Sequence, residues 1–101
     1  MTVYVIEFGE SIGNKSNRRG QAKFYVGYCE NGREEKRLAE HRKGNGASIT
    51  RAVAQKGIEM NIVLTIDGDR KVERWFKNKK DTPRIVKRYR ETGKLPIPKF
   101  Q

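Results

Sequence analysis

Short runs of β-branched and aromatic residues along the chain predict three strands. The runs are TVYVIEF (2–8), KFYVGYC (23–29) and MNIVLTI (60–66). Such side chains fit the pleated surface of a sheet, and the turn-forming pairs Asn31-Gly32 and Asp67-Gly68 close the second and third runs. We expect the first two strands to form a hairpin, while the pattern leaves the position of the third strand open.

Four other segments have the composition or spacing of helices. In the first two, residues 34–43 are good helix formers that stop at Gly44, and the stretch after them carries Ile49 and Val53 four residues apart. These features predict a highly charged helix, then a short second helix within 44–57 after a glycine hinge.

The last two helices are predicted over residues 69–80 and from Asp81 or Thr82 to Gly93. Pro83 suits a first helical turn, because its missing N–H costs nothing there, and glycine is a common helix stop. The side chains expected to face the core are Val72, Trp75, Phe76 and the stem of Lys79 in one helix, and Ile85, Val86 and Tyr89 in the other.

The order of these elements predicts an α+β fold, in which a small three-stranded sheet, antiparallel or mixed, is flanked by helices. A chain of 101 residues suits one domain, which we place at residues 1–93. Residues 9–22 lack apolar periodicity and predict a long loop, and residues 94–101, KLPIPKFQ, predict a proline-rich C-terminal tail.

Charge changes this picture because it points to a partner. The chain has 23 Lys and Arg against 12 Asp and Glu, a net charge of +11, which favours a polyanion and above all nucleic acid. A membrane partner is disfavoured, since the chain has neither a signal-peptide pattern nor an apolar run near the ~18 residues that a span needs. We therefore expect a soluble, cytoplasmic protein. One cysteine excludes an intrachain disulfide, and one Cys with one His cannot form a Cys/His zinc site.

Taken singly, the polar residues are weak candidates for chemistry. Tyr4 and Tyr25 lie in strands, where a tyrosine is more often part of the core. Arg37 and His41 are four residues apart and share one helix face, but such a face is usually only solvated. Glu73 stands among basic residues, which makes weak surface ion pairs the plain interpretation.

Taken in order, the same residues resemble the GIY-YIG nuclease family. Thr2-Val3-Tyr4 stands where the family has Gly-Ile-Tyr, and Tyr25-Val26-Gly27 stands where it has Tyr-Ile-Gly. The segment RLAEHRKGNGASITR (37–51) fits the pattern RLxEHxxGxGAxxTR of the small, stand-alone members, and the resemblance extends over about residues 2–89. The chain departs from the family in lacking the first glycine and in the longer connection between the tyrosine strands, which suggests an added substrate-contacting loop.

The resemblance implies a metal-dependent endonuclease that hydrolyses DNA phosphodiester bonds and is structure-selective or weakly sequence-specific. Glu73 would bind one Mg²⁺ or Mn²⁺ ion and Arg37 would clamp the scissile phosphate. Tyr4 would act as general base toward water if nearby positive charge lowers its pKa, Tyr25 would position phosphate or water, and His41 would accept or relay the proton. Gly27 would let helix and DNA approach the strand. The implied partner is DNA, branched or damaged DNA included, bound by a monomer or weak homodimer.

The remaining positive charge is assigned to the phosphate backbone, which supplies affinity without sequence discrimination. The expected contacts are Arg18 and Arg19 at the tip of the long loop, with Arg42, Lys43, Arg51, Lys77, Lys79, Lys80, Arg84, Lys87 and Arg88. The alternative is a non-catalytic, basic nucleic-acid-binding module on the same fold, in which the tyrosines only pack.

Overall fold

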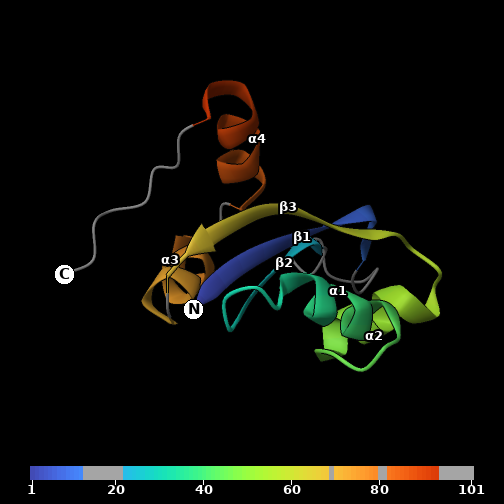
Figure 1. Cartoon of the computed structure of the whole chain (residues 1–101). Coiled ribbons are helices and arrows are strands. Elements are labelled where there is room, and N and C mark those ends of the chain that lie inside the picture. Colours follow the sequence, from blue (N-terminus) through green and yellow to red (C-terminus); the bar gives the residue numbers. More distant parts are fainter. Residues whose placement is uncertain (13–21, 69, 80–81, 94–101) are drawn as a thin grey trace.

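The structure, a computed structural model, describes residues 1–12, 22–68, 70–79 and 82–93, with the backbone alone at Ala22, Lys77 and Lys79. Its seven elements are β1 (Thr2–Ile12), β2 (Ala22–Cys29), α1 (Glu34–Arg42), α2 (Ser48–Gln55), β3 (Met60–Asp67), α3 (Arg70–Lys79) and α4 (Thr82–Thr92) (Figure 1). The predicted α+β class and the order of elements are confirmed.

The three strands form one antiparallel sheet in the order β2-β1-β3, so β1 lies in the centre. The predicted hairpin of β1 and β2 is confirmed, and β3 takes the open edge on the other side of β1. In this register Tyr4 lies between Gly27 on β2 and Thr65 on β3. The centre of the sheet therefore places the first predicted catalytic tyrosine directly beside a residue without a side chain.

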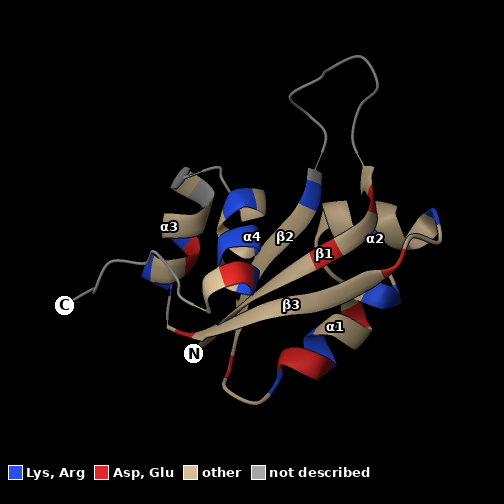
Figure 2. Cartoon of the chain, turned by 90° about the horizontal axis from the view of Figure 1, so that it is seen from above, with Lys and Arg blue, Asp and Glu red and all other residues tan. Residues whose placement is uncertain are grey.

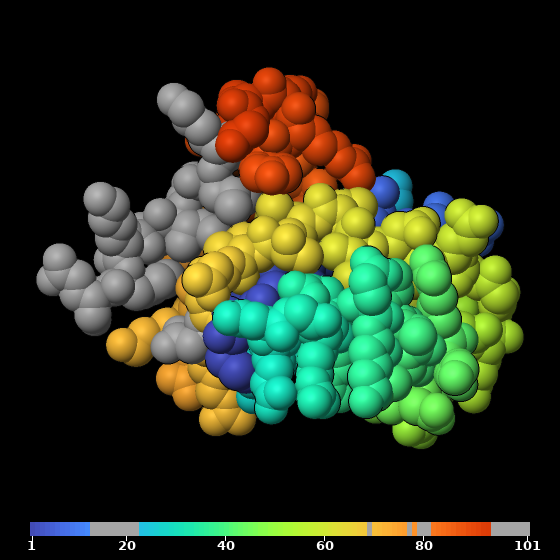
Figure 3. Space-filling view, in the orientation of Figure 1, coloured from blue at the N-terminus to red at the C-terminus, as the bar shows by residue number. Residues whose placement is uncertain are grey.

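Helices cover both faces of the sheet, which divides the core into two clusters. Val3 and Val5 on β1 pack with Phe76 of α3 and with Ile85 and Val86 of α4. The alternate residues of β1 are Tyr4, Ile6 and Phe8, which pack with Leu38 of α1 and Val53 of α2. Figure 3 shows the resulting layers, with α4 at the top, β3 across the middle and α1 and α2 below. Burial on both faces explains why TVYVIEF reads as an almost continuous apolar run.

The prediction of a loop over residues 9–22 is wrong at both of its boundaries. β1 continues to Ile12 and β2 begins at Ala22, and these two residues pair after an irregularity in the ladder that starts beyond Glu7. Ile12 is 7% exposed and anchors the end of β1 in the core, whereas residues 9–11 are exposed and carry no apolar signal. Backbone pairing, which no side-chain pattern reports, extends the strands.

The predicted helix stops are confirmed. Gly44 after α1 and Gly93 after α4 have φ of 80° and 71°, a left-handed conformation that glycine adopts without strain. Ile85 and Val86 are buried and Tyr89 is half-buried, as expected for the inward side of α4.

The cluster between the sheet and the last two helices gives a stability prediction. Phe76 is fully buried, so Phe76→Ala should lower the free energy of unfolding by about 3–5 kcal/mol through lost burial and a residual cavity. Asn78→Ala, at an exposed position of the same helix, should change it by less than about 0.5 kcal/mol. Urea unfolding followed by circular dichroism measures both, and equal effects would contradict the described packing of α3.

Candidate functional site

A pocket of about 350 Å³ gathers the residues that the sequence analysis selected for catalysis. Tyr4 comes from β1, Tyr25 from β2, Arg37 and His41 from α1, and Glu73 from α3. The other lining residues are Tyr28, Glu40, Asn45, Gly46 and Ala47. Side chains up to 69 positions apart in the sequence, from 4 to 73, thus face one space.

Tyr4 fits into this site because Gly27 lies opposite it. A Cβ atom at position 27 would be 2.6 Å from both Cζ and Oη of Tyr4, far closer than van der Waals contact. The tyrosine ring on the neighbouring strand is therefore a sufficient reason for this glycine, and the approach of a helix or DNA stays a prediction.

A chain of hydrogen bonds leads from Tyr4 into the protein interior. Tyr4 Oη is 2.9 Å from His41 Nε2, and His41 Nδ1 is 2.7 Å from Thr50 Oγ1. Thr50 Oγ1 in turn donates to the carbonyl oxygen of Ala47 over 2.9 Å. His41 is only 4% exposed and Thr50 is fully buried. Sequence reasoning missed Thr50, although it lies within the segment 37–51 on which the family resemblance depends.

The His41 ring occupies space that only a glycine leaves free. A Cβ atom at Gly46 would collide with the imidazole ring, with Nδ1 as its nearest atom. The edge of the ring also meets Tyr25, with ring centroids 5.1 Å apart. His41 is therefore held from α1, β2 and the loop before α2 at once.

Arg37 lies at the solvent side of the pocket. Its side chain is 52% exposed, and Nη1 donates to Glu40 Oε2 over 3.2 Å, one turn further along α1. An exposed pair of this kind contributes well under about 1 kcal/mol. A phosphate oxygen could therefore replace the carboxylate as the partner of this guanidinium.

Burial dominates the titration of the three aromatic groups. It is the largest cause that raises the pKa of Tyr4 above its ordinary 10, with Tyr25 adding to it and Arg37 opposing. Burial likewise raises the pKa of Tyr25, with a further increase from Glu73. For His41 burial lowers the pKa below its ordinary 6.5, with Glu40 opposing and Arg37 adding. Near neutral pH the site therefore holds two protonated tyrosines and a neutral imidazole.

The charged groups of the pocket suit a divalent cation that the substrate helps to bind. The lining carries one guanidinium, on Arg37, and two carboxylates, on Glu40 and Glu73, so it has more negative than positive side chains of its own. No group of three or more His, Cys, Asp or Glu side chains that could enclose a metal occurs among the described residues. Mg²⁺ commonly binds through one or two carboxylates, several waters and a substrate phosphate. This donor set fits such an ion on Glu73 and does not fit a closed structural site.

A hydrogen bond joins two further side chains near Glu73. Arg70 Nε donates to Tyr28 Oη over 2.9 Å, and this hydrogen bond is the first of the causes that raise the pKa of Arg70. Tyr28 lines the pocket, and neither residue was selected from the sequence as part of the site. The only sequence signal for Arg70 is its position one helical turn before Glu73.

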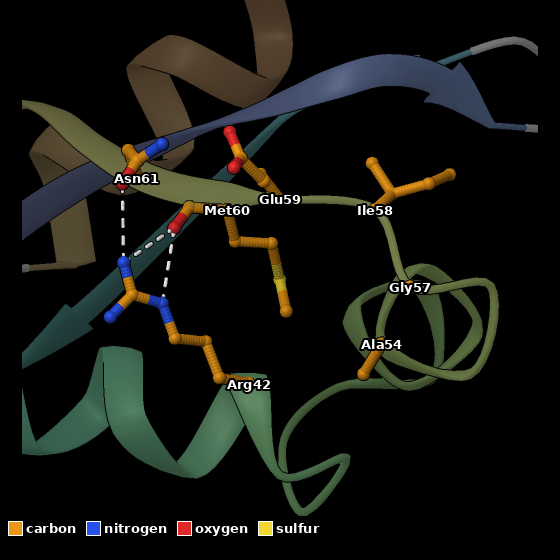
Figure 4. A pocket seen from close by; sticks show the side chains of 7 residues that line it. All are labelled: Arg42, Ala54, Gly57, Ile58, Glu59, Met60 and Asn61. Carbon is orange, nitrogen blue, oxygen red and sulfur yellow. Dashed lines mark hydrogen bonds between the residues drawn. The ribbon is translucent and has the colours of Figure 1, made fainter.

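Two of the arginines expected to bind phosphate have structural partners. Arg42 donates from Nε and Nη2 to the carbonyl oxygen of Met60, at 3.2 and 2.9 Å, and from Nη2 to Asn61 Oδ1, which ties the end of α1 to β3 (Figure 4). These contacts border a second pocket of about 420 Å³, away from the predicted catalytic residues. Arg51 donates to the carbonyl oxygen of Gly44 over 3.3 Å.

The other expected phosphate contacts are distributed over the molecule. Lys43 is exposed just after α1. Arg84, Lys87 and Arg88 are exposed on α4, which lies on the opposite face of the sheet from α1 and α2 (Figure 2). Arg18, Arg19 and Lys80, and the side chains of Lys77 and Lys79, lie outside the described residues.

Comparison with protein-family models, curated proteins and solved structures gives no match. The relation to GIY-YIG nucleases accordingly remains a resemblance, carried by the two tyrosine strands, the segment 37–51 and Glu73. Within the described part of the chain, no helix combines the length and apolar character needed to cross a bilayer.

The glycine beneath His41 gives a matched pair of substitutions. Gly46→Ala should destabilise the protein by about 1–3 kcal/mol, because its methyl group must displace the imidazole from its contacts. Gly9→Ala introduces the same methyl group at ordinary van der Waals distances of 3.6 Å or more and should cost much less. Thermal unfolding of both variants tests the packing of His41, and an equal loss of stability would contradict it.

The lowered pKa of His41 predicts how stability depends on pH. The unfolded chain takes up the histidine proton near the ordinary pKa of 6.5, whereas the folded protein takes it up only at lower pH. Stability should therefore fall as the pH decreases below about 6.5, and more steeply for the wild type than for His41→Gln. Urea unfolding between about pH 8 and 5 measures the two slopes, and identical slopes would exclude a lowered His41 pKa.

Proposed function

We propose that this protein is a metal-dependent endonuclease of the GIY-YIG type that hydrolyses DNA phosphodiester bonds. The observation that carries the proposal is the pocket that combines Tyr4, Tyr25, Arg37, His41 and Glu73. A non-catalytic module would need the basic surface but would have no use for two hydroxyls, an imidazole, a guanidinium and a carboxylate around one space.

Hydrolysis of a phosphodiester requires an activated water, neutralisation of charge on the phosphate and stabilisation of the leaving oxygen. Arg37 supports the second requirement, because its planar guanidinium is exposed at the pocket and can donate two parallel hydrogen bonds to phosphate oxygens. Tyr25, which also lines the pocket and remains protonated, can donate to the phosphate or to the attacking water.

Proton transfer is best served by Tyr4 and His41 acting together. Burial raises the pKa of Tyr4 and opposes a lasting phenolate, so Tyr4 can act as a base toward water only if another group takes its proton. His41 is neutral and 2.9 Å away, so its Nε2 lone pair can accept the Tyr4 proton while Tyr4 Oη takes a proton from water. The hydroxide so formed attacks phosphorus while the bond between phosphorus and the 3′ oxygen breaks. The leaving oxygen takes a proton from solvent, and the proton held on His41 returns to solvent.

Glu73 is the residue that would hold the divalent ion. A bound Mg²⁺ or Mn²⁺ supplies positive charge for a phosphate oxygen and the leaving oxygen. The two carboxylates in the lining support this requirement, since they disfavour a phosphate that arrives without a cation.

The proposed substrate class is DNA cut with structure selectivity or weak sequence specificity, branched and damaged DNA included. Its phosphate backbone is matched by the net charge of +11, which gives affinity without reading bases. We propose a cytoplasmic monomer or weak homodimer, in which each pocket cuts one strand.

The function is tested by nicking of supercoiled plasmid and of a branched-DNA panel, with Mg²⁺ or Mn²⁺ against EDTA. Glu73→Gln, which removes the charge and keeps the shape, should lower the cutting rate by about 10²-fold or more and leave metal-free DNA binding nearly unchanged. Glu91→Gln, at an exposed position of α4, is the matched control and should cut as the wild type does. Salt-sensitive binding with no cutting under any metal would instead identify a binding module.

A further inference from the structure

The residues that follow α1 form a support for His41. Between Gly44 and Arg51, the loop brings Gly46 against the imidazole ring and α2 brings Thr50 to its Nδ1 atom. Ala47, the residue before α2, accepts the Thr50 hydroxyl proton on its carbonyl oxygen. Gly46 and Ala47 line the pocket, but Thr50 is not among its lining residues, so what Thr50 contributes to chemistry acts through His41.

Burial leaves these polar groups dependent on one another. Thr50 is fully buried and His41 nearly so, and among the described residues no buried side-chain nitrogen or oxygen lacks a hydrogen-bond partner. An unpaired polar group at such a site would cost about 1–3 kcal/mol. The protons of the chain are therefore expected to take the arrangement that makes the most internal hydrogen bonds.

A neutral His41 has two tautomers, the first with its proton on Nδ1 and the second with its proton on Nε2, and they allow different numbers of hydrogen bonds. In the first, Tyr4 donates to Nε2, Nδ1–H donates to Thr50 Oγ1, and Thr50 donates to Ala47 O, which makes three hydrogen bonds. In the second, Nε2–H donates to Tyr4, so His41 cannot accept the Tyr4 proton, and Thr50 donates either to Nδ1 or to Ala47 O, which makes two hydrogen bonds.

The local geometry of α2 also favours the first arrangement. Thr50 Oγ1 is 2.9 Å from the carbonyl oxygen three residues earlier, a bond that threonine commonly makes within helices. Ala47 O accepts the backbone N–H of Arg51 as well, and the two lone pairs of a carbonyl accommodate both donors. With its own proton engaged in this way, the hydroxyl offers His41 a lone pair.

We propose that Thr50 is a positioning residue that keeps the His41 proton on Nδ1 and so leaves the Nε2 lone pair facing the Tyr4 hydroxyl. The importance of this tautomer for catalysis rests on the proposed nuclease function, because only an unprotonated Nε2 can accept the Tyr4 proton. The opposite tautomer would donate to Tyr4 and block the transfer. Thr50 thereby gains a chemical role although it is not among the residues that line the pocket.

The charged and titratable groups around His41 do not fix the tautomer by themselves. Arg37 and Glu40 come from α1, Tyr4 from β1, Tyr25 from β2 and Glu73 from α3, and all line the same pocket. At Nδ1, by contrast, the hydrogen-bond partner is the hydroxyl of Thr50. A substitution that removes Thr50 Oγ1 therefore tests how this one hydrogen bond affects the tautomer of His41.

The tautomer can be measured directly, because His41 is the sole histidine of the chain. Long-range ¹H–¹⁵N spectra at about pH 8 distinguish a protonated ring nitrogen from an unprotonated one. The wild type should show protonated Nδ1 and unprotonated Nε2. Thr50→Val, which replaces the hydroxyl by a methyl group of similar size, should shift the population toward Nε2–H, and Thr50→Ser should restore Nδ1–H.

Two spectroscopic outcomes would overturn the proposal. One is a wild-type His41 with its proton on Nε2, and the other is a Thr50→Val protein with an unchanged tautomer. If Thr50→Val does not fold, the wild-type and Thr50→Ser spectra still decide, because both retain the hydroxyl and must both show Nδ1–H.

Kinetics test the consequence for catalysis. In the plasmid-nicking assay, Thr50→Val should lower kcat by about 10-fold or more with little change in KM, and Thr50→Ser should retain most of the rate. Thr65→Val, at an exposed position on β3, is the matched control. A shifted tautomer with unchanged kcat would overturn the positioning role. Absence of cutting by the wild type would instead refute the nuclease function, and the spectra would still decide the tautomer.

Discussion

The burial of β1 on both faces is the constraint on which the rest of the structure depends. Its residues alternate between two clusters, and the side of Ile6 and Phe8 also carries Tyr4, a side chain with a polar end. A hydroxyl at such a place needs a partner, so a histidine follows on α1 and a threonine on α2. The hydrogen bonds that link Tyr4, His41 and Thr50 thus follow from the burial of one tyrosine on the central strand of the sheet.

The same layering separates positive charge from the pocket. Arg42 and Arg51 donate their guanidinium N–H groups to backbone carbonyls. The basic residues of α4 lie across the sheet from Tyr4 and from the helix that carries Arg37 and His41. The net charge of the chain therefore overstates the positive potential inside the pocket, where carboxylates outnumber guanidinium groups. Basic residues outside the pocket attract a polyanion to the molecule, whereas a different set of residues, those of the pocket lining, receives the phosphate.

Much of the fold could be predicted because it follows local patterns. The β-branched and aromatic run at residues 2–8 predicted the first strand, and the helical spacing of Val72 and Phe76 predicted α3. The pairing of β3 with β1 and the extension of β1 to Ile12 depend on backbone partners far along the chain. The pocket residues were found through the resemblance and not through their individual properties. Thr50 was missed because a threonine on a short helix looks ordinary until the imidazole beside it is seen.

The pairing of Tyr4 with Gly27 has a consequence for how faithfully the hairpin assembles. A strand that slips by one residue turns every side chain to the opposite face, and in apolar hairpins several registers can compete. Here, a one-residue slip would set the branched Val26 or the large Tyr28 against the Tyr4 ring, where even a single methyl group has no room. Gly27, which leaves room for the Tyr4 ring, therefore also disfavours the wrong registers of β1 and β2. A group proposed for chemistry thus helps to select the correct pairing of the two strands.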